Sequence, residues 1–255
     1  ALVLKGANLS TGCSALTLDP SNPDHLIAGT WDFRRRPDSF RSGGDGPDAP
    51  SGSRLMESRD GGRSWAELND GNRKGLPGQP WGRVEVEFAP SNPKQLYAVI
   101  ENVRSALYVS EDGGKSWQER DRSQGMVWRP FYFSNIVVDP KDDKRLFKMG
   151  YSVIVSEDGG KSFANSGGGS HADWHDVWIN PTNTRHLIGG DDGGVWYSYD
   201  GGTRWWKGDN LPISQFYRVS ADTKDPYQVY GGLQDNSSWV GDQEYPGGIT
   251  NNRWE

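Results

Sequence analysis

Short apolar or alternating segments recur along the chain, and turn-forming residues separate them. In the stretch 177–208, "VWIN", "HLIGG", "GVWYS" and "RWWKG" are four such segments, and "PTNT" and "YDGG" are two of the turns between them. Short segments of this kind, bounded by Gly, Pro, Asn and Asp, are typical of β-strands joined by tight turns. The pattern predicts a unit of four short strands, with a hairpin between the third and the fourth.

Two landmarks repeat in the same order along the chain. The octapeptide "SRDGGRSW" at 58–65 returns as "SEDGGKSW" at 110–117, "SEDGGKSF" at 156–163 and "SYDGGTRW" at 198–205, so its aspartates are 52, 46 and 42 residues apart. A second landmark, "LTLDPSNPDHLIAG" at 16, returns at 86, 137 and 177, and in degenerate form at 219. Four-stranded units with such a period indicate a β-propeller. The predicted fold is therefore all-β, with about five four-stranded blades.

The octapeptide aspartates fit a structural role better than a catalytic one. Asp followed by Gly-Gly supplies residues that tolerate positive φ, and the carboxylate can accept hydrogen bonds from its own turn. A residue repeated in every blade is spread around a ring and does not gather in one site. We therefore predict that Asp60, Asp112, Asp158 and Asp200 close turns. The aromatic residues that end the octapeptides should be buried, and these are Trp65, Trp117, Phe163 and Trp205.

The pattern Ser-x-Asp-Gly-Gly-x-Ser-Trp resembles the Asp-box, or BNR repeat, of sialidases, xyloglucan-degrading glycoside hydrolases and sortilin-type receptors. Together with the "DPSNPxxL" landmark and "GGLQDNSSW" at 231–239, it resembles bacterial exported BNR-repeat proteins that are glycosyl hydrolase-like or sortilin-like. The resemblance implies a secreted, periplasmic or cell-surface location. The repeat itself occurs in enzymes, receptors and assembly factors alike, so the resemblance does not specify one function. The Arg-Ile-Pro signature of sialidases is absent from the sequence.

Composition and charge exclude several other classes. A net charge of −6 disfavours a nucleic-acid surface, and a single cysteine, Cys13, excludes an internal disulfide. No apolar run approaches the ~20 residues that span a bilayer. We predict no membrane span, no metal and no cofactor. Because the start "ALVLKGANLS" is similar to the end of a blade, we expect residues 1–255 to be one propeller segment, incomplete at both ends, of a larger chain or assembly.

One face of the predicted propeller carries the loops that lead into each innermost strand and those that join the second and third strands. The octapeptide turns lie on the opposite face. Loops on a rigid scaffold often carry binding residues, so we predict that this loop face, the rim, binds a ligand or partner. The predicted rim residues are Trp81, Arg83, Arg129, Tyr132, His171, Asp173, His175, Asp176, Asp191, Asp192, Phe216, Tyr217, Gln234, Asp235 and Asn236.

The segment "HADWHD" is the densest group of ionisable residues on this rim. His171, Asp173 and His175 alternate, so their side chains point the same way on an extended segment. Such a cluster can bind a divalent metal or perform acid–base chemistry near neutral pH. The alternative, which we favour, is that it ties its loop to the neighbouring blade through hydrogen bonds.

Asp192 and Asp235 are the best pair for carboxylate chemistry, because they occupy equivalent loops of neighbouring blades. A glycosidase needs two carboxyl groups about 5–9.5 Å apart. The alternative is that "DDGG" and "QDN" are simply turns, which favour these residue types. We favour turns, and therefore expect carboxyl groups more than about 10 Å apart with no open cleft between them.

The insertion 34–54 is rich in Gly, Pro, Ser and Asp, and we predict a flexible surface loop. Its arginines and Phe40 make it either a contact arm or a solvated spacer. The function predicted for the whole chain is that of an exported, non-catalytic propeller whose rim binds a protein or a glycan. The alternative is a glycoside hydrolase or lyase that uses Asp192 and Asp235 on the same rim.

Overall fold

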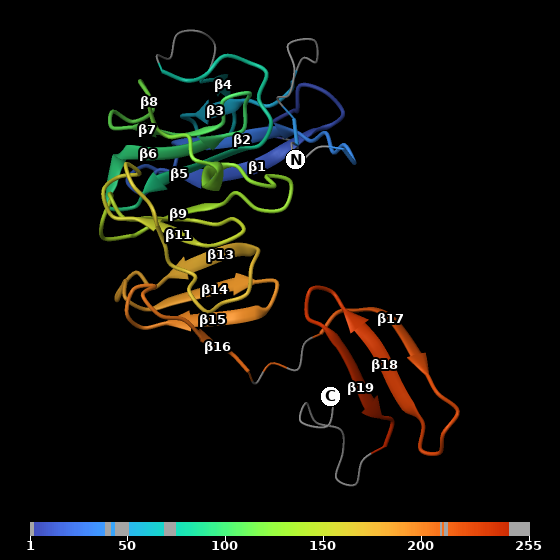
Figure 1. Cartoon of the computed structure of the whole chain (residues 1–255). Helices are drawn as coiled ribbons and strands as arrows, with labels where there is room; N and C mark the ends of the chain where they lie inside the picture. The colour runs from blue at the N-terminus through green and yellow to red at the C-terminus, as the bar shows by residue number, and fades with distance from the viewer. Residues whose placement is uncertain are drawn as a thin grey trace.

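The computed structural model describes residues 3–38, 42–43, 51–68, 75–209, 211 and 214–244. In these residues, 19 strands form five antiparallel sheets, and the helical structure is a short 3-10 turn at Gln124–Met126 (Figure 1). Across the same residues, no helix has the length and apolar character needed to cross a membrane.

Each sheet is built from strands that follow one another in the chain. The first sheet contains β1 (Thr11–Leu18), β2 (Leu26–Asp32), β3 (Leu55–Ser58) and β4 (Ala66–Glu67). The second contains β5 (Val84–Ala89), β6 (Asn92–Ile100), β7 (Ala106–Ser110) and β8 (Gln118–Asp121). The third contains β9 (Ile136–Val138), β10 (Leu146–Lys148), β11 (Ile154–Ser156) and β12 (Ala164–Asn165). The fourth contains β13 (Trp174–Ile179), β14 (Leu187–Asp191), β15 (Gly194–Ser198) and β16 (Trp206–Lys207), and the fifth β17 (Phe216–Ala221), β18 (Gln228–Leu233) and β19 (Ser238–Asp242).

The predicted all-β architecture of repeated sheets is confirmed. The second landmark joins the first and second strands of every sheet, including the fifth, where its sequence is degenerate. The octapeptide joins the third and fourth strands of the first four sheets. Among the described residues the fifth sheet has three strands.

The first four sheets pack face to face in chain order. Their innermost strands contact one another in sequence, β1 with β5, β5 with β9, and β9 with β13. Three hydrophobic cores lie between these sheets. The first includes Ile27, Val86 and Trp117, the second Tyr97, Leu107 and Val138, and the third Phe147, Trp174 and Trp196.

Hydrogen bonds inside the octapeptide close its turn. The carboxylate of Asp112 accepts hydrogen bonds from the backbone N–H groups of Lys115 (3.0 Å) and Ser116 (2.9 Å), and from the Ser116 hydroxyl (2.6 Å). The Ser110 hydroxyl donates to Asp112 (2.8 Å) and accepts from the N–H of Gly114 (2.8 Å). Gly113 and Gly114 have φ angles of 75° and 83°, which glycine adopts without steric cost.

The other octapeptides use the same chemistry. Hydrogen bonds from a serine hydroxyl and from backbone N–H groups lower the pKa of Asp60 and of Asp158 to about 2, because they favour the charged carboxylate. Asp200 accepts hydrogen bonds from Ser198 and from the backbone of Arg204. Of the octapeptide aromatics, Trp117 and Trp205 are buried, whereas Trp65 and Phe163 are half-buried.

Two segments were the subject of sequence-based expectations about the start of the chain and the insertion. Residues 3–10 form bends and turns, and the expectation that they end an earlier blade stays a prediction. The described part of the insertion 34–54 is anchored at several points, because Ser42 and Ser53 are fully buried and the backbone N–H of Ser42 donates to the Glu101 carboxylate (2.7 Å). Phe40 lies outside the described residues. Flexibility of the insertion 34–54 stays a prediction, and residues 42 and 53 within it are not at the surface.

Replacement of Asp112 by Ala should destabilise the fold by roughly 1–2 kcal/mol, because it removes the acceptor of several turn donors at a half-exposed site. Urea unfolding followed by tryptophan fluorescence measures the change. Lys115→Ala is the matched control, since its backbone and not its side chain serves the turn, and its effect should stay within about 0.5 kcal/mol. Equal effects of the two substitutions would contradict the assigned role of the carboxylate.

Candidate functional site

Loops from the fourth and fifth sheets meet at the end opposite the octapeptide turns. The loop before β13 reaches the β14–β15 turn, where the N–H of Asp192 donates to the carbonyl of Asp173 (3.2 Å). The amide of Asn236, between β18 and β19, donates to the carbonyl of Asp192 (2.7 Å). A ring nitrogen of His171 lies 3.1 Å from the carbonyl of Asp235. Hydrogen bonds therefore connect three loops from two sheets.

Unusual backbone conformations concentrate in these loops. Non-glycine residues with φ between 55° and 68° occur at Arg129, Asp173, Asp235 and Ser237. Such angles cost conformational energy for residues with a Cβ, and they cluster at sites where surrounding structure enforces them. All four positions lie in loops at the rim end of the third, fourth and fifth sheets.

Asp173 is the most constrained carboxylate of the group. One of its oxygens lies 3.3 Å from the guanidinium of Arg129, and the other is buried without a hydrogen-bond partner within the described residues. Burial raises the pKa of Asp173, and the nearby charges of Asp192 and Asp235 raise it further, against the opposing effect of Arg129. Burial also raises the pKa of Asp191, whose carboxylate accepts a hydrogen bond from the N–H of Gly193 (2.8 Å).

The two histidines of "HADWHD" make different contacts. His171 bridges to the fifth sheet, and its hydrogen bonds to the carbonyls of Ala172 and Asp235 raise its pKa. His175 lies 2.8 Å from the carboxylate of Asp192 and edge-on to the ring of Phe133. In the described part of the chain, no three His, Cys, Asp or Glu side chains are arranged to hold a metal ion. The observed contacts are those of a loop-tying network.

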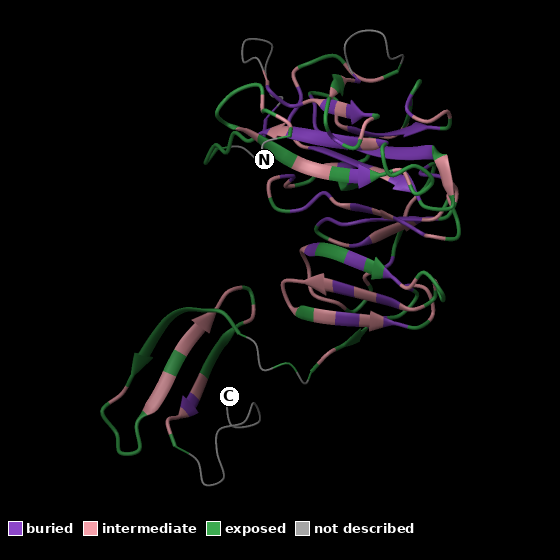
Figure 2. Cartoon of the chain, turned by 180° about the vertical axis from the view of Figure 1, so that it is seen from behind, coloured by how far each residue is buried: buried purple, intermediate pink, exposed green. Residues whose placement is uncertain are grey.

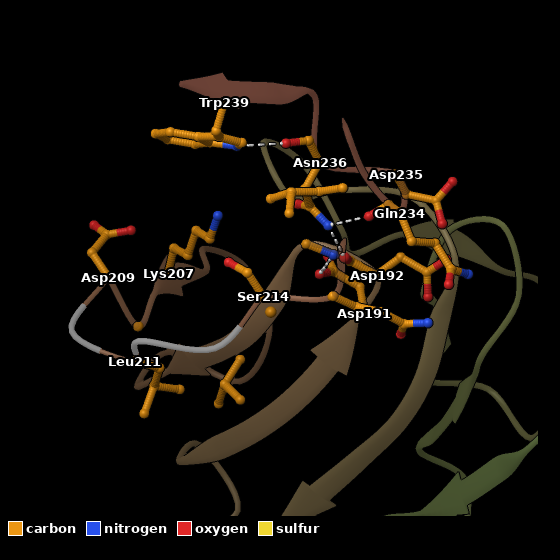
Figure 3. Close-up of a pocket in the computed structure, with 16 residues that line it drawn as sticks. Asp191, Asp192, Lys207, Asp209, Leu211, Ser214, Gln234, Asp235, Asn236 and Trp239 are labelled. Atoms are coloured by element: carbon orange, nitrogen blue, oxygen red, sulfur yellow. Dashed lines mark hydrogen bonds between the residues drawn. The ribbon is translucent and has the colours of Figure 1, made fainter. Parts of the chain in front are cut away.

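A cleft of about 390 Å³ opens between these loops (Figure 3). Asp192 and Asp235 both line it, so the expectation of no open cleft between them is wrong. The reason is that the hydrogen-bonded loops of the two sheets converge. The other side chains that line the cleft include Asp191, Lys207, Asp209, Leu211, Gln215, Gln234, Asn236 and Trp239.

Some predicted rim residues lie elsewhere. Trp81 is fully buried, and its indole N–H donates to the carbonyls of Pro77 and Gly78 (3.1 Å each), so it packs the interior and presents no binding surface. Arg83 is paired with Glu85 (2.6 Å) and donates to the carbonyl of Pro130, which links the second sheet to the loop before the third.

The remaining predicted residues are divided between the rim and a separate depression. Tyr132 is exposed, and the guanidinium carbon of Arg129 lies over its ring, 4.9 Å from the ring centroid. Phe216 and Tyr217 are exposed at the start of β17. Asp176 lines a depression along the innermost strands, away from the cleft, and burial raises its pKa.

Sequence reasoning missed Lys207 and Trp239 as cleft residues. Lys207 ends β16, immediately before the connection to the fifth sheet, and Trp239 lies in β19. Trp239 ends the segment "GGLQDNSSW", whose "QDN" was already assigned to the rim. The sequence signal that could have found Trp239 is its position in a strand that begins shortly after "QDN", because this position puts the indole close to the rim.

Comparisons with known proteins support the fold. A family profile described as BNR/Asp-box repeat matches residues 108–119, which span the second octapeptide. No curated protein sequence matches the chain. A GH74 enzyme from Niastella koreensis has a similar structure, at 15% identity and a TM-score of 0.53, over 90% of this chain and 30% of the enzyme. An ancestral GH74 enzyme is similar at 17% identity and a TM-score of 0.53, over 99% of this chain and 34% of the enzyme.

A third structure, YCF48 from Cyanidioschyzon merolae, aligns at 11% identity and a TM-score of 0.48, over 98% of this chain and 74% of that protein. The chain therefore carries the BNR/Asp-box repeat and has the sheet architecture of propellers such as the GH74 enzymes. It spans about a third of the length of the two GH74 enzymes. At these identities the likeness concerns the fold alone.

Replacement of Asp192 by Asn should lower the pKa of Asp173, because it removes one of the negative charges that oppose ionisation of the buried carboxyl. The carboxyl carbon shift of Asp173, followed by NMR through an acid titration, reports the change. Asp24→Asn, in a turn at the opposite end of the first sheet, is the control and should leave the titration of Asp173 in place. A pKa of Asp173 that rises or stays constant in Asp192→Asn would contradict the proximity of the two charges.

Proposed function

We propose that this chain is part of an exported BNR-repeat β-propeller that binds a ligand at the cleft between its fourth and fifth sheets and does not convert it. The observation that carries the proposal is the lining of the cleft. It brings together the carboxylates of Asp191, Asp192 and Asp235 with the amides of Gln234 and Asn236. Such a surface offers many hydrogen-bond acceptors at one place, supported on loops that the sheets hold in position.

The chemistry of the lining favours a ligand rich in donors. Charged carboxylates form their strongest hydrogen bonds with O–H and N–H groups. The hydroxyl groups of a glycan meet this requirement along the whole ligand. The net charge of −6 also disfavours polyanionic ligands such as nucleic acid. A glycan is therefore the first ligand class to test, and an exposed protein segment rich in Lys or Arg is the second.

The same contacts argue for binding over catalysis. Asp192 is held by His175, and its backbone carbonyl is used by Asn236. The carbonyl of Asp235 is used by His171. These bonds fix the loops, which suits a preformed binding surface. The location outside the cell rests on the resemblance to exported BNR-repeat proteins.

A second candidate is a glycoside hydrolase that uses Asp192 and Asp235. One observation favours it, namely that both residues line one cleft. Two carboxyl groups that flank a bound sugar are what hydrolysis requires. The GH74 enzymes of similar fold show that such a scaffold occurs in enzymes. The binding proposal and this one differ in a single readout, the appearance of new reducing ends.

Titration of the chain with a panel of soluble polysaccharides and basic peptides, followed by calorimetry, should identify a polysaccharide that binds. Asp192→Ala and Asp235→Asn should each weaken that binding by about tenfold, corresponding to about 1.4 kcal/mol, because each removes a charged acceptor. Asp24→Asn, remote from the cleft, is the matched control and should bind as the wild type does.

Two results would contradict the proposal. Unchanged affinity in both cleft variants would remove the cleft as the binding site. Release of reducing ends by the wild type, lost in Asp192→Ala or Asp235→Asn while the polysaccharide still binds, would establish the hydrolase instead.

A further inference from the structure

Arginines gather in two rim segments that lie away from the cleft. The segments are residues 33–38, which follow β2, and residues 122–135, which join β8 to β9. Together they contain five arginines and one acidic residue, Asp38. The cleft between the fourth and fifth sheets has the opposite character, because four aspartates and one lysine line it. The rim of a chain with a net charge of −6 therefore includes a region in which cations outnumber anions.

Arg35 differs from the other four of these arginines, because its guanidinium group faces aromatic rings and no carboxylate. Its guanidinium carbon lies 3.8 Å from the ring centroid of Phe131 and 5.0 Å from that of Tyr132. In the part of the chain that the structure describes, no acidic side chain is paired with it. The other four form ion pairs, Arg34 with Asp32, Arg36 with Asp38, Arg122 with Glu119 and Arg129 with Asp173. Because Arg35 is exposed, its N–H donors are accessible to a partner.

Tyr132 contacts two guanidinium groups. The guanidinium carbon of Arg129 lies 4.9 Å from its ring centroid, and that of Arg35 lies at 5.0 Å. Stacking on an aromatic ring holds a guanidinium group in one orientation, and the carboxylate of Asp173 (3.3 Å) also holds that of Arg129. Side chains that are already ordered lose less conformational entropy when a partner binds. The two guanidinium groups are therefore preorganised on the rim.

Hydrogen bonds also fix the backbone next to Arg35. The N–H of Phe33 donates to the carbonyl of Ser10 (3.3 Å), and the N–H of Arg34 donates to the carbonyl of Ser42 (3.0 Å). The side chain of Arg34 binds the buried carboxylate of Asp32 (3.0 Å). The first sheet therefore anchors the segment from which Arg35 extends to the rings of the loop before β9.

Exposed aromatic side chains continue this surface across the rim of the third sheet. Figure 2 shows exposed segments at the ends of the sheets, beside the largely buried strands of the second sheet. Tyr132 and Tyr151 are each 47% exposed and Trp128 is 38% exposed, and the rings of Trp128 and Tyr151 lie 5.1 Å apart. The carbonyl of Tyr151 accepts the N–H of Asp173, whose carboxylate binds Arg129. We define the arginine–aromatic patch as Arg35, Trp128, Arg129, Phe131, Tyr132 and Tyr151.

We propose that the arginine–aromatic patch binds an acidic segment of a partner protein, at a site separate from the cleft and independent of its ligand. Trp, Tyr and Arg are the residue types that contribute most of the binding energy in protein–protein interfaces. The guanidinium group of Arg35 donates two parallel hydrogen bonds to a carboxylate of the partner. Apolar groups of the same segment pack against Trp128 and Tyr151. The charge of Arg35 favours an acidic partner and repels a basic one.

Binding of a fluorescein-labelled peptide that alternates Glu and Tyr tests the proposal. Fluorescence anisotropy measures the Kd of this peptide for the full chain. The same peptide with Gln in place of Glu tests the requirement for charge, and a labelled oligogalacturonate tests an acidic glycan. The Glu–Tyr peptide should bind most tightly of the three, and its Kd should rise with salt concentration, because the ions screen an exposed charge.

Substitutions in the patch should weaken binding of the Glu–Tyr peptide. Arg35→Ala should raise the Kd by about tenfold, because it removes the charged donor, and Tyr132→Ala should raise it several-fold, because it removes the ring on which two guanidinium groups stack. Arg35→Lys should also weaken binding, since lysine keeps the charge but lacks the planar pair of donors. Two controls should not weaken it. They are Arg63→Ala, an exposed arginine in the first octapeptide, and Asp235→Asn in the cleft.

Four outcomes would overturn the proposal. The first is the absence of binding by the Glu–Tyr peptide. The second is equal binding by the peptide that contains Gln. The third is tighter binding of the oligogalacturonate with the same dependence on Arg35, which would assign the patch to an acidic glycan. The fourth is a Kd that stays unchanged in both Arg35→Ala and Tyr132→Ala, measured on variants whose thermal unfolding matches that of the wild type.

Discussion

Packing between successive sheets is the interaction on which the rest of this structure depends. A four-stranded sheet has two faces, and a single blade cannot bury both against itself. The middle-strand residues Ile27, Tyr97 and Phe147 are fully buried because the next sheet covers each of them. The octapeptide turns assist this packing from one end, since they hold Trp117 and Trp205 in the same cores.

Because this packing uses the faces of each sheet, the turns and loops at its two ends have different roles. At one end, the Asp-box turns satisfy their own backbone donors and are alike from blade to blade. At the other, the loops vary in length and composition, and they are joined by hydrogen bonds between sheets. The carboxyl groups also differ between the two ends, since burial raises the pKa of Asp173 and of Asp191 in the loops, whereas hydrogen bonds lower the pKa of Asp60 and of Asp158 in the octapeptide turns.

The sequence predicted the sheets well because the repeat is encoded by local turn chemistry and strand alternation. It predicted the buried environment of the loops poorly, since that environment depends on residues far apart in the chain. Trp81 is buried in the core that includes Leu55 and Leu68, and Gln79, in the same loop, donates to the carbonyl of Ser53 in the insertion. Ser42 is buried because Glu101, 59 residues away, accepts its N–H. No pattern in the sequence close to Gln79 or Ser42 predicts either contact.

The cleft between Asp192 and Asp235 was missed for a similar reason. Each loop by itself has the sequence of a turn. The hydrogen bonds made by His171 and Asn236, which join the two loops, depend on residues far apart in the chain. The central claim is that this loop end, and not the Asp-box end, carries binding. Hydrogen–deuterium exchange with and without a saturating polysaccharide from the binding panel tests it most directly. The account predicts slower exchange in the segments 171–176, 191–193 and 234–236 and unchanged exchange in the octapeptide turns. Slower exchange in the octapeptide turns alone would contradict it.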